Sequence, residues 1–195
     1  MKKIACVLIA LSLTGCFGPV APVQITQYNL NALPDTLPPH HKKSATLLVL
    51  PPATKPVYNT TNMIYSDQPY QIESFVLNQW AKTPSDMLQS LIVETLTKAN
   101  YFKAVVTPPY VGYYTYALNT HIFELQQDYT SASPVLHLSV QAQLIKASTQ
   151  AVVASTVITI NEPILEKTPY GGVIAANKAT SEMLSELASF TSRHT

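Results

Sequence analysis

The stretch TPSDMLQSLIVETLTKAN, residues 83–100, decides the fold because it carries every signal of an amphipathic helix. Thr83 can cap the first turn with its hydroxyl, Pro84 suits the first helical position, and Asp86 puts negative charge near the free N–H groups. Asn100 fits a left-handed stop. Apolar positions recur at helical spacing and form one stripe: Met87, Leu88, Leu91, Ile92, Thr95, Leu96 and Ala99. We expect the rest of the chain to cover this stripe.

Short apolar runs flank this helix on both sides. Upstream, Leu47–Leu50 reads as a buried strand that Pro51-Pro52 stops, and Phe75–Ala81 leads directly into the helix start. Downstream, Tyr101–Val106 reads as a return strand, which Pro108-Pro109 ends. The helix therefore lies between strands along the chain.

Three later segments alternate apolar and polar residues, which is typical of strands with one buried face. They run from Tyr114 to Ile122, from Leu136 to Leu144, and from Val152 to Ile160. Turns are expected at 127–134 and 148–150, so the three segments predict an antiparallel meander.

A second helix is expected from Tyr170 onward, with the pair Gly171-Gly172 as its turn and N-cap. Its apolar stripe comprises Ala176, Thr180, Met183, Leu184, Leu187 and Phe190. Two amphipathic helices on one face of a mixed, mostly antiparallel sheet give a two-layer α+β domain.

The segment from Pro56 to Val106 resembles the ABC-type transport auxiliary lipoprotein family. The residues that carry the resemblance are Met63-x-Tyr65, Trp80-Ala81, Pro84 and Met87-Leu88, and Tyr28-x-Leu30 resembles the family's opening strand. This family includes the outer-membrane lipoprotein of paraquat-inducible systems, which work with MCE-domain proteins. The resemblance implies an auxiliary subunit of an envelope transport system, with an MCE-domain protein as partner and a role in outer-membrane integrity.

The N-terminus reads as a lipoprotein signal peptide over residues 1–15. Lys2-Lys3 precede an apolar run, Ile4–Leu13, that is too short for a bilayer span of roughly twenty residues. Small residues stand directly before Cys16, so we predict Cys16 as the lipidation site and first mature residue. The alternatives are an ordinary signal peptide or a short buried helix. Because Phe17 rather than aspartate follows, the outer membrane is the expected destination, by analogy with other bacterial lipoproteins.

Residues 16–45 are expected to form a tether that links the lipid anchor to one periplasmic domain over residues 46–195. Prolines interrupt regular structure throughout the segment: Pro19, Pro22, Pro34, Pro38 and Pro39. Alternation near 23–30 predicts one short strand within it.

Composition argues against several function classes. A net charge of +1 with only 12% charged residues leaves no basic patch for nucleic acid. Cys6 lies in the segment predicted to be cleaved, and the thiol of Cys16 is predicted to carry the lipid. The mature chain is therefore expected to have no thiol for a disulfide or a metal. His121 and His137 could meet across neighbouring strands and bind a metal, but no carboxylate accompanies them. No catalytic motif appears, and we expect neither an enzyme nor a cofactor.

Two surfaces are candidates for protein contacts. The polar sheet face around His121, Gln141 and Thr159 is nearly uncharged, either because a partner covers it or because it is an ordinary exposed face. The chain has 11 tyrosines against 5 phenylalanines, and tyrosine is favoured at interfaces. We predict homo-oligomerisation into a ring through this sheet face and a flank around Tyr58 and Tyr65.

Three functions remain open at this point. The first is a lipid-anchored docking subunit for an MCE-type transport assembly. The second is a periplasmic carrier that holds a lipid or other apolar molecule between the helices and the sheet. The third is a pilotin-like assembly factor for another envelope machine.

Overall fold

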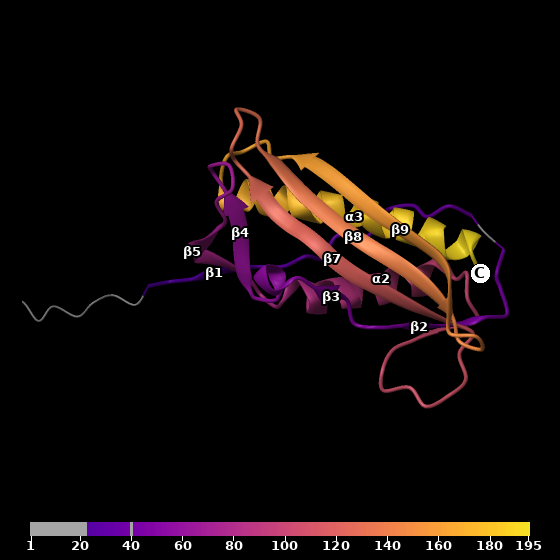
Figure 1. Ribbon diagram of the computed structural model, residues 1–195. Helices are drawn as coiled ribbons and strands as arrows, with labels where there is room; N and C mark the ends of the chain where they lie inside the picture. Colours follow the sequence, from indigo (N-terminus) through magenta and orange to yellow (C-terminus); the bar gives the residue numbers. More distant parts are fainter. Residues whose placement is uncertain (1–22, 40) are drawn as a thin grey trace, which may run out of the picture.

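The computed structural model describes residues 23–39 and 41–195 (Figure 1). The predicted signal peptide and Cys16 lie outside these residues. The elements, in chain order, are β1 (Thr26–Tyr28), β2 (Thr46–Val49), β3 (Ala53–Thr54), the 3-10 turn η2 (Pro56–Tyr58), β4 (Asn62–Ser66), β5 (Glu73–Trp80), α2 (Pro84–Ala99), β6 (Ala104–Val106), β7 (Tyr116–Asp128), β8 (Val135–Lys146), β9 (Ala151–Pro163) and α3 (Pro169–Arg193).

The helix expected after Thr83 is confirmed, together with its caps. The Thr83 hydroxyl accepts a hydrogen bond from the Asp86 N–H at 3.3 Å. Asn100 ends the helix in the left-handed region, with φ 54° and ψ 30°. The predicted stripe is buried from Met87 to Leu96, and Ala99 is half-buried. The local sequence therefore fixes both ends and the buried face of α2.

The predicted meander is confirmed and forms the long part of the sheet. β8 pairs antiparallel with both β7 and β9. The opposite edge of β7 receives β2, β3 and β4 in parallel, at successive places along its length. β6 then adds in parallel to β2, β5 adds antiparallel to β4, and β1 adds in parallel to β5. The sheet is therefore mixed, and its two longest pairings are antiparallel.

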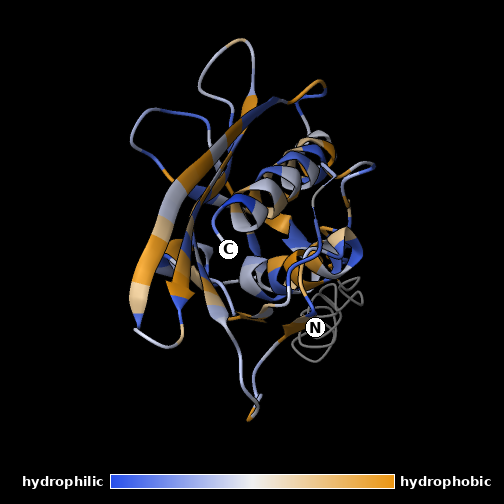
Figure 2. Cartoon of the chain, turned by 90° about the vertical axis from the view of Figure 1, so that its right-hand side faces the viewer, coloured by the Kyte–Doolittle hydropathy of each residue, from blue (hydrophilic) through white to orange (hydrophobic). Residues whose placement is uncertain are grey.

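Both helices cover the same face of this sheet (Figure 2). The second layer is α3 over β8 and β9, with α2 beside it over β2 and β6. Fully buried side chains fill the space between the layers: Leu47, Leu88, Ile92, Leu118, Ile122, Leu138, Leu144, Met183 and Leu184. Burying such a side chain stabilises the fold by about 1.5–3 kcal/mol. The two-layer α+β arrangement is the one that the sequence predicts.

A bulge in β7 reverses its inward-facing positions. Before it, Leu118 and Ile122 point toward the helices, whereas after it Leu125 and Gln127 do. The register shift falls between Ile122 and Glu124 and inserts one extra residue, Phe123. The simple alternation from Tyr114 to Ile122 therefore does not continue along the strand.

The folded domain begins well before residue 46, which corrects the expected tether. Leu30 is only 3% exposed and belongs to the main core. The side chain of Asn177 on α3 binds the backbone of the two residues that follow Leu30. Its Oδ1 accepts from the N–H groups of Asn31 at 2.8 Å and Ala32 at 3.1 Å. The prolines exclude regular secondary structure here but do not prevent packing. β1 is short, and Val23 and Ile25 before it are exposed.

Helix α3 starts differently from the expectation. Its N-cap is Thr168, whose hydroxyl accepts from the Gly171 N–H at 3.0 Å, so both glycines lie inside the first turn. A Cβ on Gly172 would lie 2.0 Å from the side chain of Gln127 on β7. The glycines therefore serve close packing of helix on sheet rather than a turn. Within the described part of the chain, no helix is long and apolar enough to cross a bilayer.

Candidate functional site

The structure brings three predicted interface residues onto one surface. We call the side of β7, β8 and β9 that faces away from the helices the bare sheet face. On it, His121 of β7 lies directly opposite Gln141 of β8. Thr159 of β9 lies opposite Ser139, and their hydroxyl oxygens are 3.2 Å apart. A groove of about 340 Å³ between this face and Leu50–Ala53 is lined in part by His121 and Gln141.

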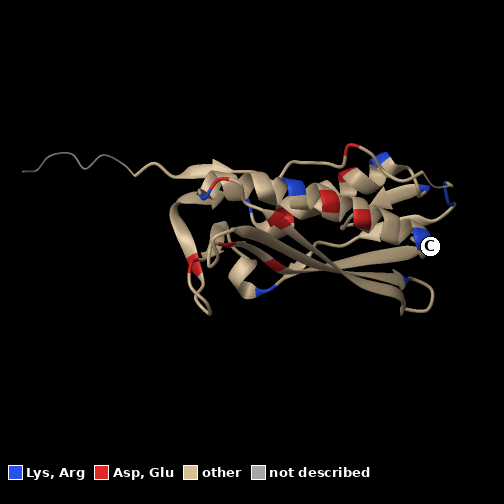
Figure 3. Ribbon diagram, turned by 90° about the horizontal axis from the view of Figure 1, so that it is seen from above, with Lys and Arg blue, Asp and Glu red and all other residues tan. Residues whose placement is uncertain are grey.

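Charge is sparse at the centre of the bare sheet face. In Figure 3 most charged residues lie along the helices and at the ends of the molecule. The outward residues at the centre include one charged side chain, Glu124 opposite Ser139. The others are Asn119, His121, Ser139, Gln141, Gln143, Ser155, Val157 and Thr159. Interfaces are typically depleted in charge at their centre, and this face has that composition.

Strand β9 is a free edge of the sheet. It pairs only with β8, although it is 13 residues long. No charged side chain occurs from Ala151 to Asn161, and Val152, Val153 and Val157 are exposed. Natural sheets usually protect such an edge with lysine, proline or a covering loop. On β9 a charge and a proline, Glu162 and Pro163, stand only at the C-terminal end of the strand, and the pairing with β8 is irregular near Leu144 and Ile145.

The second predicted surface does not exist as one surface, because Tyr58 and Tyr65 lie on opposite sides of the sheet. The Tyr58 hydroxyl bonds Gln126 Oε1 at 3.1 Å, whereas Gln127 packs against Gly172 of α3. Neighbouring strand residues point to opposite faces, so Tyr58 lies on the side away from the helices. Tyr65 instead packs against the core on the helix side.

Their surroundings explain why each tyrosine is held in place. Tyr58 is 6% exposed, and burial, followed by the negative charge of Glu124, raises its pKa to about 12. It therefore offers almost no surface to a partner. Tyr65 donates a hydrogen bond to Glu73, which raises the pKa of Tyr65, and its ring stacks on Phe75 at 4.3 Å.

A small hollow of about 210 Å³ lies beside Tyr65, at the start of α3. Phe75 and Tyr129 line it with Lys167, whose ammonium group is 5.8 Å from the centre of the Tyr129 ring. The Tyr129 hydroxyl bonds Gln127 Oε1 at 2.6 Å and the carbonyl of Thr168 at 2.9 Å, and burial raises its pKa to about 12. These contacts join β7 to the first turn of α3. The aromatic cluster therefore has a role in packing the fold.

His121 and His137 do not meet. Their strand partners are different, Gln141 for His121 and Gln126 and Asn161 for His137. His137 Nδ1 lies 2.6 Å from Asn161 Oδ1, and its Nε2 lies 3.4 Å from Asp128 Oδ2. The pKa of Asp128 is lowered: burial opposes this, but hydrogen bonds from Thr130 and His137 outweigh it. No group of three possible metal ligands occurs among residues 23–39 and 41–195.

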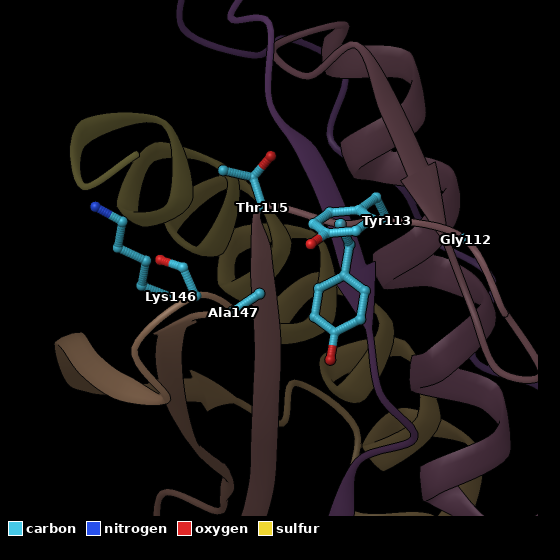
Figure 4. Close-up of a pocket in the computed structure, with 7 residues that line it drawn as sticks. Gly112, Tyr113, Thr115, Lys146 and Ala147 are labelled. Carbon is cyan, nitrogen blue, oxygen red and sulfur yellow. The ribbon is translucent and has the colours of Figure 1, made fainter.

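The loop between β6 and β7 forms a further surface that the sequence only hinted at. It projects from the end of the molecule where β7 begins (Figure 1). Val111 and Tyr113 are fully exposed, at 103% and 99%. Tyr113, Tyr114 and Thr115 surround an open hollow of about 600 Å³ together with Lys146 and the turn after β8 (Figure 4). The tyrosine bias was visible in the sequence, but its juxtaposition with Lys146 depends on the pairing of β7 with β8.

The comparisons with known proteins agree with this fold. The sequence model of the family described as ABC-type transport auxiliary lipoprotein component matches residues 28–188. Protein XCC0632 from Xanthomonas campestris, of family DUF330, has a similar structure, with a TM-score of 0.80 at 22% identity over 87% of this chain and 96% of that one. An uncharacterized protein has a TM-score of 0.65 at 13% identity, over 87% and 97% of the two chains. At these identities the likeness concerns the fold alone. No curated protein sequence matches the chain.

Proposed function

Because the chain belongs to the family of ABC-type transport auxiliary lipoprotein components, we propose that it is the docking subunit of an MCE-type transport system. In this proposal Cys16 carries the lipid anchor in the outer membrane, and the domain faces the periplasm. The subunit helps to maintain the outer membrane by holding the transport assembly to it. No catalytic step is assigned to it.

The bare sheet face is the observation that carries this proposal. One side of the sheet is fully covered by α2 and α3, whereas the other side exposes three long strands that carry hardly any charge (Figures 2 and 3). Such a face suits burial against protein. Its residues are neither arranged around a reacting group nor gathered into a cluster of titratable side chains.

The carrier alternative has less support. A carrier would need space between the helices and the sheet for an apolar ligand. That space holds side chains with no solvent exposure, among them Leu118, Leu138, Met183 and Leu184. The hollows at Tyr113 and at His121 open on the surface instead.

We further propose that copies of the domain associate through the bare sheet face and the free edge of β9. Ring formation needs two different patches on each subunit. The sheet face supplies one patch. The edge of β9 replaces the Tyr58 and Tyr65 flank as the other, because an edge strand offers unpaired N–H and C=O groups to a second chain.

Copurification of the full-length lipoprotein with the MCE-domain protein of the same system tests the docking role. Envelopes are solubilised in mild detergent, and the lipoprotein is isolated through a C-terminal tag. We expect the MCE-domain protein to be recovered with the wild-type chain, and Gln141→Arg to reduce its recovery because the substitution places a charge on the bare sheet face. Val76→Arg is the matched control, because Val76 is 81% exposed on β5, which is not one of the three strands of this face. Recovery of the wild-type lipoprotein without the MCE-domain protein would overturn the docking role.

A further inference from the structure

We propose that the end of the molecule opposite the tether binds an acidic and apolar surface of the protein partner. This inference rests on the proposed function and adds a second contact surface to the bare sheet face. We call this end the tyrosine pole. It comprises the loop 107–115, the turn 147–150, and the basic residues of the segments bonded to them.

The loop is held in a defined shape although its tip is exposed. Pro108 and Pro109 restrict its first half, and the Tyr110 hydroxyl donates to the carbonyl of Tyr113 at 3.4 Å. At its end, the Thr115 N–H donates to the carbonyl of Thr46 at 2.9 Å, and the Ala147 N–H donates to the carbonyl of Thr115 at 3.0 Å. A loop that is ordered before binding loses less conformational entropy when a partner contacts its side chains.

The tip presents apolar surface that nothing in the described chain covers. Val111 and Tyr113 are fully exposed, and no charged residue occurs from Ala104 to Thr115. An exposed apolar surface rimmed by polar residues is typical of an interaction site, and the tip of this loop exposes both Val111 and Tyr113. Tyrosine is one of the residues that contribute most to binding when a partner buries it.

Basic residues surround this loop without acidic ones. The loop's base is bonded to the segment 42–46 through Thr115 and Thr46. Further hydrogen bonds join that segment to 100–104 and 190–195: the Lys43 N–H donates to the carbonyl of Tyr101, the Lys103 N–H donates to the carbonyl of Ala45, and the Lys43 ammonium donates to the carbonyl of Ser192 at 2.8 Å. These segments and the turn after β8 contain no aspartate or glutamate. They supply Lys42, Lys43, Lys103, Lys146 and Arg193. Positive charge of this kind steers and orients a negatively charged partner.

The position of the pole favours a protein over the anchoring bilayer. Residue 23 and the loop 107–115 lie at opposite ends of the molecule (Figure 1). β7, which runs between these ends, has 13 residues, a length of roughly 40 Å. Six residues lie between Cys16 and Val23, and the seven chain steps from one to the other reach at most about 25 Å. A domain whose near end stays at the membrane therefore turns the tyrosine pole away from it, toward the other components of the system.

The opposite end of the molecule is acidic, so the two ends differ in charge and the basic pole does not reflect a general excess of lysine. Asp67, Glu73, Asp128 and Glu166 lie in the segments around the start of α3, where Lys167 is the nearby basic residue. Figure 3 shows blue residues collected toward the C-terminal end. The partner surface that fits the tyrosine pole is accordingly acidic, with apolar side chains for Val111 and Tyr113.

Binding to the purified periplasmic region of the MCE-domain protein tests the inference. The full-length lipoprotein is placed in nanodiscs, and Kd is measured for the wild type, Tyr113→Ala and Lys146→Glu. We expect each substitution to raise Kd about tenfold or more, and Lys146→Glu also to reduce the salt dependence of binding. The matched controls are Tyr70→Ala, a fully exposed tyrosine at the other end, and Lys82→Glu, outside the pole. Both should bind as the wild type does.

Other outcomes separate the inference from the function on which it rests. If the wild type binds and both pole variants bind equally well, the inference is overturned while the docking role stands. If the wild type does not bind at all, the docking role itself is overturned. The Cys16→Ser chain is also mixed with vesicles that contain phosphatidylglycerol. Loss of vesicle binding in Tyr113→Ala, with MCE binding unchanged, would assign the pole to a lipid surface and refute a protein contact.

Discussion

Gly172 lets α3 approach the sheet, and Gly171 lets the first turn of α3 approach the segment before it, more closely than any other residue type would allow. A Cβ on Gly171 would lie 2.1 Å from the carbonyl oxygen of Glu166, which already accepts a hydrogen bond from the Thr168 N–H at 2.7 Å. That oxygen belongs to the backbone and cannot swing aside. The neighbour of Gly172 is the side chain of Gln127, which is 1% exposed and has little room to move.

Substitution of these glycines gives a prediction with a definite sign. Alanine is the better helix former by about 1 kcal/mol, so helix propensity alone would make Gly171→Ala stabilising. We expect overpacking to outweigh this, and the free energy of unfolding to fall by about 1–3 kcal/mol in urea denaturation of the Cys16→Ser chain. Gly112→Ala is the control, because its neighbour is the end of the Tyr110 side chain, which is 39% exposed and has room to turn aside, so the change should stay within about 0.5 kcal/mol. An unchanged or higher stability of Gly171→Ala would contradict the close approach.

The side of the sheet on which Tyr58 and Tyr65 lie could not be predicted from residue type alone. Both are tyrosines with an apolar body and a polar tip, and both precede β5 along the chain. The 3-10 turn η2 carries Tyr58 to one side of the sheet, and β4 carries Tyr65 to the other. Sequence composition shows that such side chains need a hydrogen-bond partner, but the partners, Gln126 and Glu73, are set by pairing between strands.

At the scale of elements, α2 supports one quantitative prediction. Leu96 is 1% exposed within the stripe that packs on the sheet and α3. Leu96→Ala should lower the free energy of unfolding by roughly 2–5 kcal/mol, because it removes buried methyl groups and leaves a cavity. Leu165→Ala is the matched control, since Leu165 is 92% exposed. A loss below about 1 kcal/mol for Leu96→Ala would show that the stripe does not face the core.

The sequence predicts elements whose signals are local. The caps and stripe of α2 all lie within residues 83–100, and the period-two patterns of β8 and of the later part of β9 lie within each strand, so these are confirmed. The start of β9 differs: the pattern predicts Val152 on the buried face, but a register shift near Leu144 and Ile145 leaves Val152 52% exposed. The parallel addition of β2, β3 and β4 to β7 joins residues far apart in sequence, and no local pattern specifies it. The bulge at Phe123 and the packing of Leu30 depend on tertiary contacts in the same way.

The free edge of β9 predicts self-association. An unprotected edge offers unpaired N–H and C=O groups to a second chain, so the Cys16→Ser chain should form oligomers at tens of micromolar in light scattering. Val157→Lys places a charge at the middle of this edge and should shift the chain toward monomer. Val76→Lys is the control, because Val76 is exposed on β5. A parent chain that is monomeric at this concentration would leave neither the edge nor the bare sheet face with a role in oligomers.

At the scale of the whole molecule, the position of the N-terminus decides which surfaces of the domain can reach a partner. The described residues begin at one end of the sheet, and the tyrosine pole lies at the other (Figure 1). With the proposed anchor at Cys16, the end that carries the tyrosine pole is the one presented to the periplasm. The candidate surfaces follow from the fold, whereas their proposed orientation follows from the anchor. The predicted lipidation site therefore decides the orientation of every surface.

Cys16 gives the last prediction, which uses the full chain. A bacterial culture expressing the protein is labelled with a palmitate analogue, and the purified lipoprotein is analysed for label and for membrane association. We expect the wild type to be labelled and Cys16→Ser to be unlabelled, because Cys16 is the only cysteine after the predicted cleavage point. Cys6→Ser is the matched control and should be labelled as the wild type is, since Cys6 lies in the segment that is removed. One acyl chain binds a membrane only marginally whereas two or more anchor it stably, so Cys16→Ser should also leave the membrane fraction. Label on Cys16→Ser, or loss of label from Cys6→Ser, would contradict Cys16 as the lipidation site. The orientation inferred for the domain would then lose its basis.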